Sequence, residues 1–153
     1  MLGQLTPGEI EQLLSSEITG RIGCHADERT YVVPITYAYQ SGNVYCHSAE
    51  GQKVRMMRKN PDVCFEVDRV EDVGNWKSVV ANGRFQELGG RAALEAMDVL
   101  IARSATIERA QGPHPSYVFR ALEAESPRTD GRPIVLFRIR LIEKTGRFEQ
   151  TSP

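Results

Sequence analysis

A histidine, a serine, a glycine and a lysine stand close together between Cys46 and Lys53, where the sequence reads CHSAEGQK. The small residues of this stretch predict a turn, followed by a short basic helix over 52–59 that stops at Asn60-Pro61. The start of a helix offers free backbone N–H groups and the positive end of the helix dipole, and a Lys ammonium adds a point charge. The pattern therefore predicts a site for an anion such as a phosphate, and with it a phosphorylated cofactor.

Each of these residues also has an ordinary structural interpretation. Lys53 and the three other cations of the helix are equally expected on a solvated helix face. Ser48 could serve only as the N-cap of the helix, and His47 could be a hydrogen-bonded residue in the turn. Trp76 begins a later strand, where a hydrophobic anchor is the simplest role, and Ser78 is compatible with a surface position on that strand.

Metal and nucleophilic chemistry have little support in the sequence. The three histidines lack the spacing of metal ligands, and no nucleophile–base signature is present. The three cysteines are an odd number without a close pair, so we interpret them as free and mostly buried thiols of a cytoplasmic protein: Cys24, Cys46 and Cys64. We therefore expect no bound metal and favour chemistry supplied by a cofactor.

Length and composition fit one soluble domain spanning 1–153. Hydrophobic residues make up 41% and charged residues 25% of the 153 residues, which is ordinary for a globular protein. The formal net charge of −1 gives no basic field for nucleic acid. No apolar run approaches a membrane span, and the N-terminus does not resemble a secretory signal. We expect no nucleic-acid or membrane partner.

Along most of the chain, apolar and polar residues alternate with a period of two. Six strands are expected, at 18–25, 30–40, 44–47, 63–68, 76–88 and 135–142. Helices are expected from Pro7 to about Ser16 behind a Thr6–Glu9 capping box, over 52–59, over 91–103 and, within the weakly patterned segment 104–132, around 116–125. The connections are short, so the strands should be antiparallel. The predicted fold is mainly β (α+β), a six-stranded Greek-key barrel with peripheral helices.

Pro34 interrupts the second expected strand. It removes a backbone donor from the hydrogen-bond ladder, which indicates an edge position, a bulge, or a place where something other than a strand lies alongside.

The order of three segments resembles a known family. These are YVVPITYAYQSGNVYCHSAEGQK (31–53), NPDVCFEV (60–67) and WKSVVANGRFQEL (76–88). They are similar to the pyridoxamine 5′-phosphate oxidase-like, FMN-binding split-barrel proteins, and most of all to the branch of nitroimidazole-resistance reductases. The resemblance spans roughly 5–88 and the last strand up to Thr145-Gly146-Arg147.

The resemblance implies FMN in a cleft between the two subunits of a homodimer. The strand beside the isoalloxazine ring would correspond to Val32, Val33, Pro34, Ile35 and Thr36. The following turn, Cys46, His47 and Ser48, would contact the flavin and its ribityl chain. Gln52 and Lys53 would hold the phosphate, although Gln52 stands where the family has an arginine, so another arginine could substitute. Trp76 and Ser78 belong to a segment that matches a later cofactor-contacting strand.

The implied activity is that of an FMN-dependent oxidoreductase. Electrons would pass from a nicotinamide cofactor to a small acceptor, for example a nitroaromatic compound, with His47 near the flavin or substrate as the catalytic candidate. The C-terminal Trp and Arg with which the oxidase proper holds pyridoxal phosphate have no match in 131–153, which argues against vitamin B6 oxidation. Two alternatives stay open: a deazaflavin- or haem-binding relative, and a flavin-binding protein without catalytic turnover.

Overall fold

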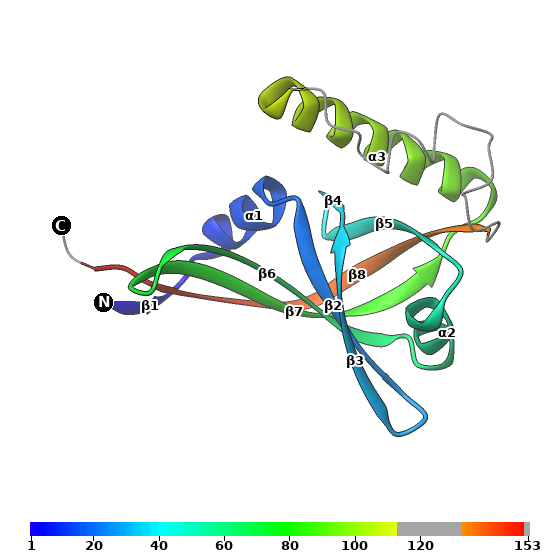
Figure 1. Cartoon of the computed structure of the whole chain (residues 1–153), viewed down its shortest axis with the longest axis horizontal. Coiled ribbons are helices and arrows are strands. Elements are labelled where there is room, and N and C mark those ends of the chain that lie inside the picture. The colour runs from blue at the N-terminus through cyan, green and yellow to red at the C-terminus, as the bar shows by residue number, and fades with distance from the viewer. Residues whose placement is uncertain (113–132, 152–153) are drawn as a thin grey trace.

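The computed structural model describes residues 1–112 and 133–151, which form one antiparallel sheet with helices around it (Figure 1). The strands are β1 (Leu2–Gln4), β2 (Thr19–Ala26), β3 (Arg29–Thr36), β4 (Ala38–Gln40), β5 (Asn43–Ala49), β6 (Asp62–Asp72), β7 (Asn75–Glu87) and β8 (Ile134–Glu149). The helices are α1 (Pro7–Ser16), α2 (Gln52–Lys59) and α3 (Gly90–Gln111). No helix in the described part of the chain is long and apolar enough to cross a membrane.

The strand order is β3-β2-β6-β7-β8-β5-β4, with β1 added beside β8. Every pairing is antiparallel, and the path stays open between its first strand, β3, and its last, β4. This confirms the prediction of a mainly antiparallel split barrel. The described residues form eight strands rather than six because β1 pairs with β8 and because the expected strand over 30–40 is divided at Tyr37.

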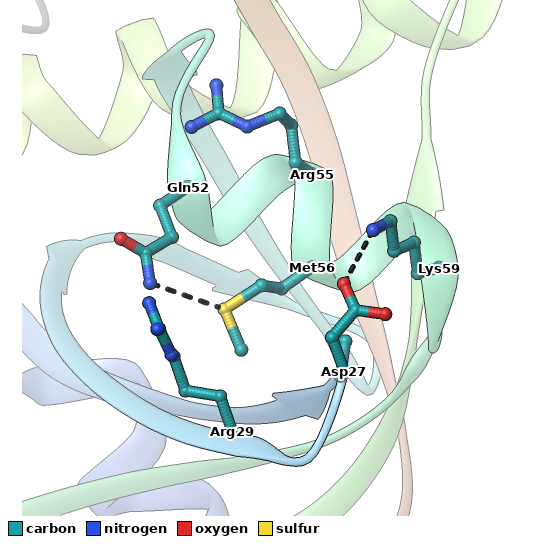
Figure 2. A pocket seen from close by; sticks show the side chains of 7 residues that line it. Asp27, Arg29, Gln52, Arg55, Met56 and Lys59 are labelled. Atoms are coloured by element: carbon teal, nitrogen blue, oxygen red, sulfur yellow. Dashed lines mark hydrogen bonds and ion pairs between the residues drawn. The ribbon is translucent and has the colours of Figure 1, made fainter.

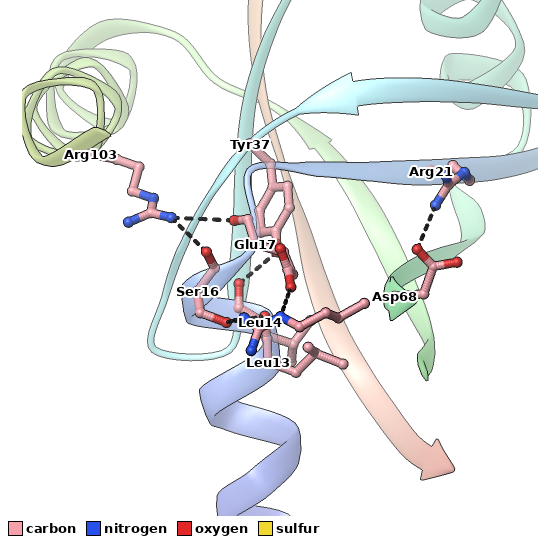
Figure 3. Close-up of polar contacts among 9 residues, drawn as sticks. Leu13, Leu14, Ser16, Glu17, Arg21, Tyr37, Asp68 and Arg103 are labelled. Atoms are coloured by element: carbon pink, nitrogen blue, oxygen red, sulfur yellow. Dashed lines mark hydrogen bonds and ion pairs between the residues drawn. The ribbon is translucent and has the colours of Figure 1, made fainter. Parts of the chain in front are cut away.

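Tyr37 links the two ends of the sheet. It is the one residue between β3 and β4, and its side chain is only 1% exposed. Its hydroxyl donates a 2.6 Å hydrogen bond to the Leu14 carbonyl oxygen of α1 (Figure 3). Its ring packs edge-on against Phe65, with 4.9 Å between ring centroids. The chain thus turns from one end of the sheet to the other around a fully packed, hydrogen-bonded corner.

Of the three interpretations of Pro34, the structure supports the edge position, because β3 pairs only with β2 among the strands of the described residues. An edge strand tolerates the missing backbone donor of proline, whereas a central strand would lose a ladder hydrogen bond.

The core lies on the inner face of the curved sheet. Alternate residues of β2 and β6 point into it, among them Ile22, Cys24, Phe65 and Val67. Leu14 of α1 and Val54 and Met57 of α2 complete it. The Thr6–Glu9 capping box predicted for α1 is present, since the Thr6 hydroxyl accepts from the Glu9 N–H and the Glu9 carboxylate accepts from the Thr6 N–H.

Helix α3 is longer than predicted, because the residues after Arg103 (SATIERAQ) form helix well and continue it to Gln111. The buried residues of α3 are Ala96, Leu100 and Ser104, whereas Leu94 is 62% exposed. The Arg103 guanidinium donates to the Ser16 and Glu17 carbonyl oxygens at 3.1 and 3.4 Å, which ties α3 to the end of α1 (Figure 3). The helix expected around 116–125 lies outside the described residues.

Candidate functional site

The start of α2 has no side-chain cap from the described residues. Its N-cap is Gly51, whereas α1 begins with a complete capping box. Ser48, considered above as the cap, instead donates from its hydroxyl to the Ala49 carbonyl oxygen at 3.0 Å. The first N–H groups of α2 thus receive no acceptor from a capping side chain, which is the geometry that anions occupy at helix starts.

Lys53 lies in the first turn of α2 and is half-buried. Burial raises the pKa of the Cys46 thiol, and the Lys53 charge acts in the opposite direction on it. The Cys24 thiol likewise has a pKa raised by burial and by Cys64, with Lys53 again lowering it. Lys53 is therefore near enough to interact electrostatically with thiols of both β2 and β5. All three cysteines are free, and Cys24 and Cys46 are buried, as predicted.

A pocket of about 430 Å³ lies between one face of α2 and the turn that joins β2 to β3 (Figure 2). Gln52, Arg55, Met56 and Lys59 line one wall, at the spacing of a single helix face. Ala26, Asp27 and Arg29 line the other wall. Figure 2 shows Arg29 and Gln52 pointing toward each other beside Met56, with the Gln52 amide 3.8 Å from the Met56 sulfur.

The cations of α2 are not equivalent. Arg58 is held by Glu87 in a two-point ion pair at 2.7 and 2.8 Å and by Glu50. Lys59 pairs with Asp27 at 2.5 Å. Arg55 and Arg29, by contrast, form no ion pair with any residue that the structure describes. The positive charge available to a ligand is therefore concentrated at the end of the pocket near Gln52.

The predicted contacts on β5 divide between two faces of the sheet. Cys46 is fully buried in the core, and its raised pKa keeps it a neutral thiol. His47 is 9% exposed and opposes Leu136 of β8. Leu136 and Tyr45 pack with Leu100 of α3, so His47 lies on the face of the sheet that α3 covers.

The predicted contacts on β3 alternate in the same way. Val32, Pro34 and Thr36 are exposed on the outer face, whereas Ile35 is buried and Val33 half-buried on the inner face. Val32 lines a largely apolar pocket of about 500 Å³ on the outer face, together with His25, Cys64 and Ile142. The outer face of β3 is thus an accessible apolar surface.

Trp76 and Ser78 lie at the other end of the molecule. They oppose Glu149 and Arg147 at the end of β8, while Ala49, just before α2, opposes Ile134 at its beginning. These positions are about 43–50 Å apart along the strand at about 3.3 Å per residue. The β6–β7 turn and α2 accordingly lie at opposite ends of the long axis in Figure 1. One chain therefore does not bring Trp76 and Ser78 to the start of α2.

The surroundings of Trp76 form a separate pocket of about 230 Å³, lined by residues of β6, β7 and the end of β8. The Trp76 indole N–H donates to the Glu149 carboxylate at 3.0 Å, which fixes the ring against β8.

Sequence reasoning missed Arg29 and Arg55 as members of the site. Arg55 stands three residues after Gln52, so helical spacing alone could have placed it on the same face. Arg29 could not have been found in this way, because its position depends on how α2 packs against the β2–β3 turn.

The fold and this basic helix start are those of a split-barrel protein. A family model described as pyridoxamine 5′-phosphate oxidase matches residues 6–146, so the chain belongs to that family.

Two solved structures cover nearly the whole chain. A protein from Mesorhizobium loti named as FAD-binding is 29% identical over 98% of this chain and 99% of its own, with a TM-score of 0.74. A protein from Corynebacterium glutamicum named as a pyridoxamine 5′-phosphate oxidase homologue is 26% identical over 99% and 100% of the two chains, with a TM-score of 0.67.

Two further matches carry less information. A 5-nitroimidazole antibiotic resistance protein homologue from Bacteroides thetaiotaomicron is 18% identical over 97% of this chain and 87% of its own, with a TM-score of 0.69, and it supports the fold alone. An uncharacterised protein of Rhizobium meliloti is 40% identical over 80 residues, which are 52% of this chain and 53% of that protein. The match thus spans about half the length of that relative.

Proposed function

We propose that the protein binds a flavin phosphate at the start of α2 and works as a flavin-dependent oxidoreductase. The observation that carries the proposal is the helix start without a side-chain cap, with Lys53 in its first turn and a basic pocket beginning at Gln52. Membership of the family supports it, because its model spans residues 6–146. FMN is the form that we propose first, and the FAD-binding relative favours FAD as the second candidate.

The chain's own residues would bind and orient the cofactor. The N–H groups of Gln52 and Lys53, with the Lys53 ammonium, would hold the phosphate. The edge of β3, from Val32 to Thr36, would lie along the ring. When bound, the flavin would supply hydride or single-electron transfer.

His47 is our candidate for contact with the flavin ring or the substrate. It is buried, and an imidazole can donate or accept a proton near neutral pH. Cys46 is an unsuitable nucleophile, because burial raises its pKa and keeps the thiol protonated. We propose a nicotinamide cofactor as electron donor and a small acceptor, such as a nitroaromatic compound, as substrate.

A homodimer would unite the two ends of the molecule in one site. Trp76 and Ser78 are about 43–50 Å away from the start of α2 along β8, so they can contribute to a flavin site there only if a second copy presents them. We therefore propose that each site takes Lys53 from one protomer and the Trp76 end of β7 from its partner.

The visible spectrum of the purified protein tests the flavin directly. We expect a yellow protein that releases FMN or FAD on denaturation, or a colourless protein that becomes yellow with added flavin. A protein that ignores both flavins would contradict the proposal and leave a deazaflavin or haem as ligand. Anaerobic reduction with NADH or NADPH followed by a nitroimidazole then separates an enzyme, which reoxidises with the acceptor, from a protein that only stores flavin.

A further inference from the structure

The pocket along α2 is larger than a single phosphate requires. Its volume of about 430 Å³ lies within the range of sites for small organic molecules, about 300–1,000 Å³. It extends from Gln52 to Lys59 over two helical turns, which is about 10 Å. A phosphate at the start of α2 would occupy only one end of it.

The two ends of the pocket differ in charge. At the Gln52 end, Arg29 and Arg55 form no ion pair with any described residue, and Arg55 extends back toward the start of α2 (Figure 2). At the far end, Asp27 already neutralises Lys59. Two arginines on opposite walls suit a phosphate, because each guanidinium can make two parallel hydrogen bonds to its oxygens.

The remaining lining suits a purine base. Ala26 and the Met56 thioether form an apolar floor, and a polarizable sulfur packs well against aromatic rings. A guanidinium plane can also stack on a base.

We propose that this pocket binds an adenosine phosphate, with Arg29 and Arg55 on its phosphate. The inference rests on the proposed function, since the flavin phosphate at the start of α2 would adjoin the Gln52 end of the pocket. The adenosine phosphate could arrive in two ways with the same chemistry: as the second half of FAD, or as part of a nicotinamide dinucleotide bound next to FMN. The residues that decide between a mononucleotide and a dinucleotide are then Arg29 and Arg55.

The test compares ligands on flavin-free protein by isothermal titration. Riboflavin, FMN, FAD and AMP are titrated into the wild type, into Arg29→Gln/Arg55→Gln, and into the control Arg84→Gln/Arg91→Gln. The control removes the same charge from exposed arginines of β7 and α3 outside the pocket. We expect the pocket variant to lose FAD or AMP affinity by about tenfold or more for each arginine, while FMN affinity changes less than about threefold. The control should match the wild type.

A second titration separates the two sources. If FAD binds the wild type no better than FMN, NADPH and AMP are titrated into the FMN-loaded protein, and weakening by Arg29→Gln/Arg55→Gln assigns the pocket to the electron donor. An equal loss of FMN and FAD affinity would overturn the proposal, because the arginines would then hold the phosphate that both flavins share, and the proposed function would stand. No change for any ligand would also overturn it. AMP binding to a wild type that binds no flavin would support the pocket and reject the proposed function.

Discussion

The Tyr37 hydroxyl donates a 2.6 Å hydrogen bond to the carbonyl oxygen of Leu14, near the end of α1. Tyr37 directly follows β3, whose residues Val32–Thr36 are proposed to lie along the flavin ring. The bond thus fixes the C-terminal end of β3, a strand at the edge of the sheet, to α1. An edge strand has only one strand neighbour, so this corner determines much of its position.

Tyr37→Phe should therefore lower the free energy of unfolding by about 1–2 kcal/mol, because the buried Leu14 carbonyl loses its partner while the ring packing remains. Urea unfolding measures the change. Tyr45→Phe is the matched control, since no described residue hydrogen-bonds to the Tyr45 hydroxyl and the ring is only half-buried. Equal effects of the two substitutions would contradict the role assigned to Tyr37.

The same residue predicts a loss of stability in alkali. Burial raises the pKa of Tyr37 above its ordinary value of 10.0, so the folded chain retains the phenol proton more strongly than the unfolded chain. Its contribution is complete below pH 10 and is lost as the pH rises above it. The stability advantage of the wild type over Tyr37→Phe should therefore shrink as the pH rises from about 10 to 11. An advantage that stays constant over this range would contradict the buried phenol.

The Arg58–Glu87 ion pair predicts a loss of stability in acid. The hydrogen bonds from Arg58 hold the pKa of the Glu87 carboxyl below its ordinary value of 4.5. The stabilisation is present above pH 4.5 and lost as the pH falls through the lower pKa of the folded state. Both side chains are partly exposed, so Glu87→Gln should cost only about 0.5–1 kcal/mol at pH 7.

Thermal unfolding at pH 7 and pH 3 measures this difference. The wild type should exceed Glu87→Gln at pH 7 and approach it at pH 3. Asp62→Asn is the control, because it removes a single exposed pair with Arg84 in which neither Arg58 nor Glu87 takes part. A difference that grows toward pH 3 would have the wrong sign for this pair.

The proposed sharing of each site between protomers can be tested by mixing two defective chains. Lys53→Ala and Trp76→Ala should each bind FMN poorly when alone. Co-expressed, they should restore about a quarter of the sites, since half of the random dimers are mixed and one of their two sites carries neither substitution. Absorbance at flavin wavelengths after gel filtration counts the occupied sites. No recovery in proven mixed dimers would show that Trp76 acts within its own chain or not at all.

Local sequence signals predicted a good part of this molecule. The bounds of α2 follow from a small-residue turn before it and Asn60-Pro61 after it, and the capping box locates the start of α1. Alternation of apolar residues located six of the strands. The short strands β1 and β4 carry no such signal, because three residues cannot show a period, and they exist only through their pairing with β8 and β5.

The limits of the prediction at the site have the same cause. The helix start with Gln52 and Lys53 is a local feature and was predicted. The contribution of Arg29 depends on the packing of α2 against the β2–β3 turn, and the separation of Trp76 from α2 depends on the length of β8. The order of motifs in the sequence assigned Lys53 and Trp76 to one site, although the folded chain holds them at opposite ends.

The most direct test of the account is the affinity of flavin-free Lys53→Ala for FMN and for riboflavin, measured against the wild type and Lys59→Ala. If the flavin phosphate sits at the start of α2, Lys53→Ala should lose about 1.5–3 kcal/mol of FMN binding and almost none of riboflavin binding. Lys59→Ala should retain FMN, because Lys59 is at the far end of α2 in an ion pair with Asp27. Equal losses of FMN affinity in the two variants, or equal losses of FMN and riboflavin in Lys53→Ala, would contradict a phosphate site at this helix start.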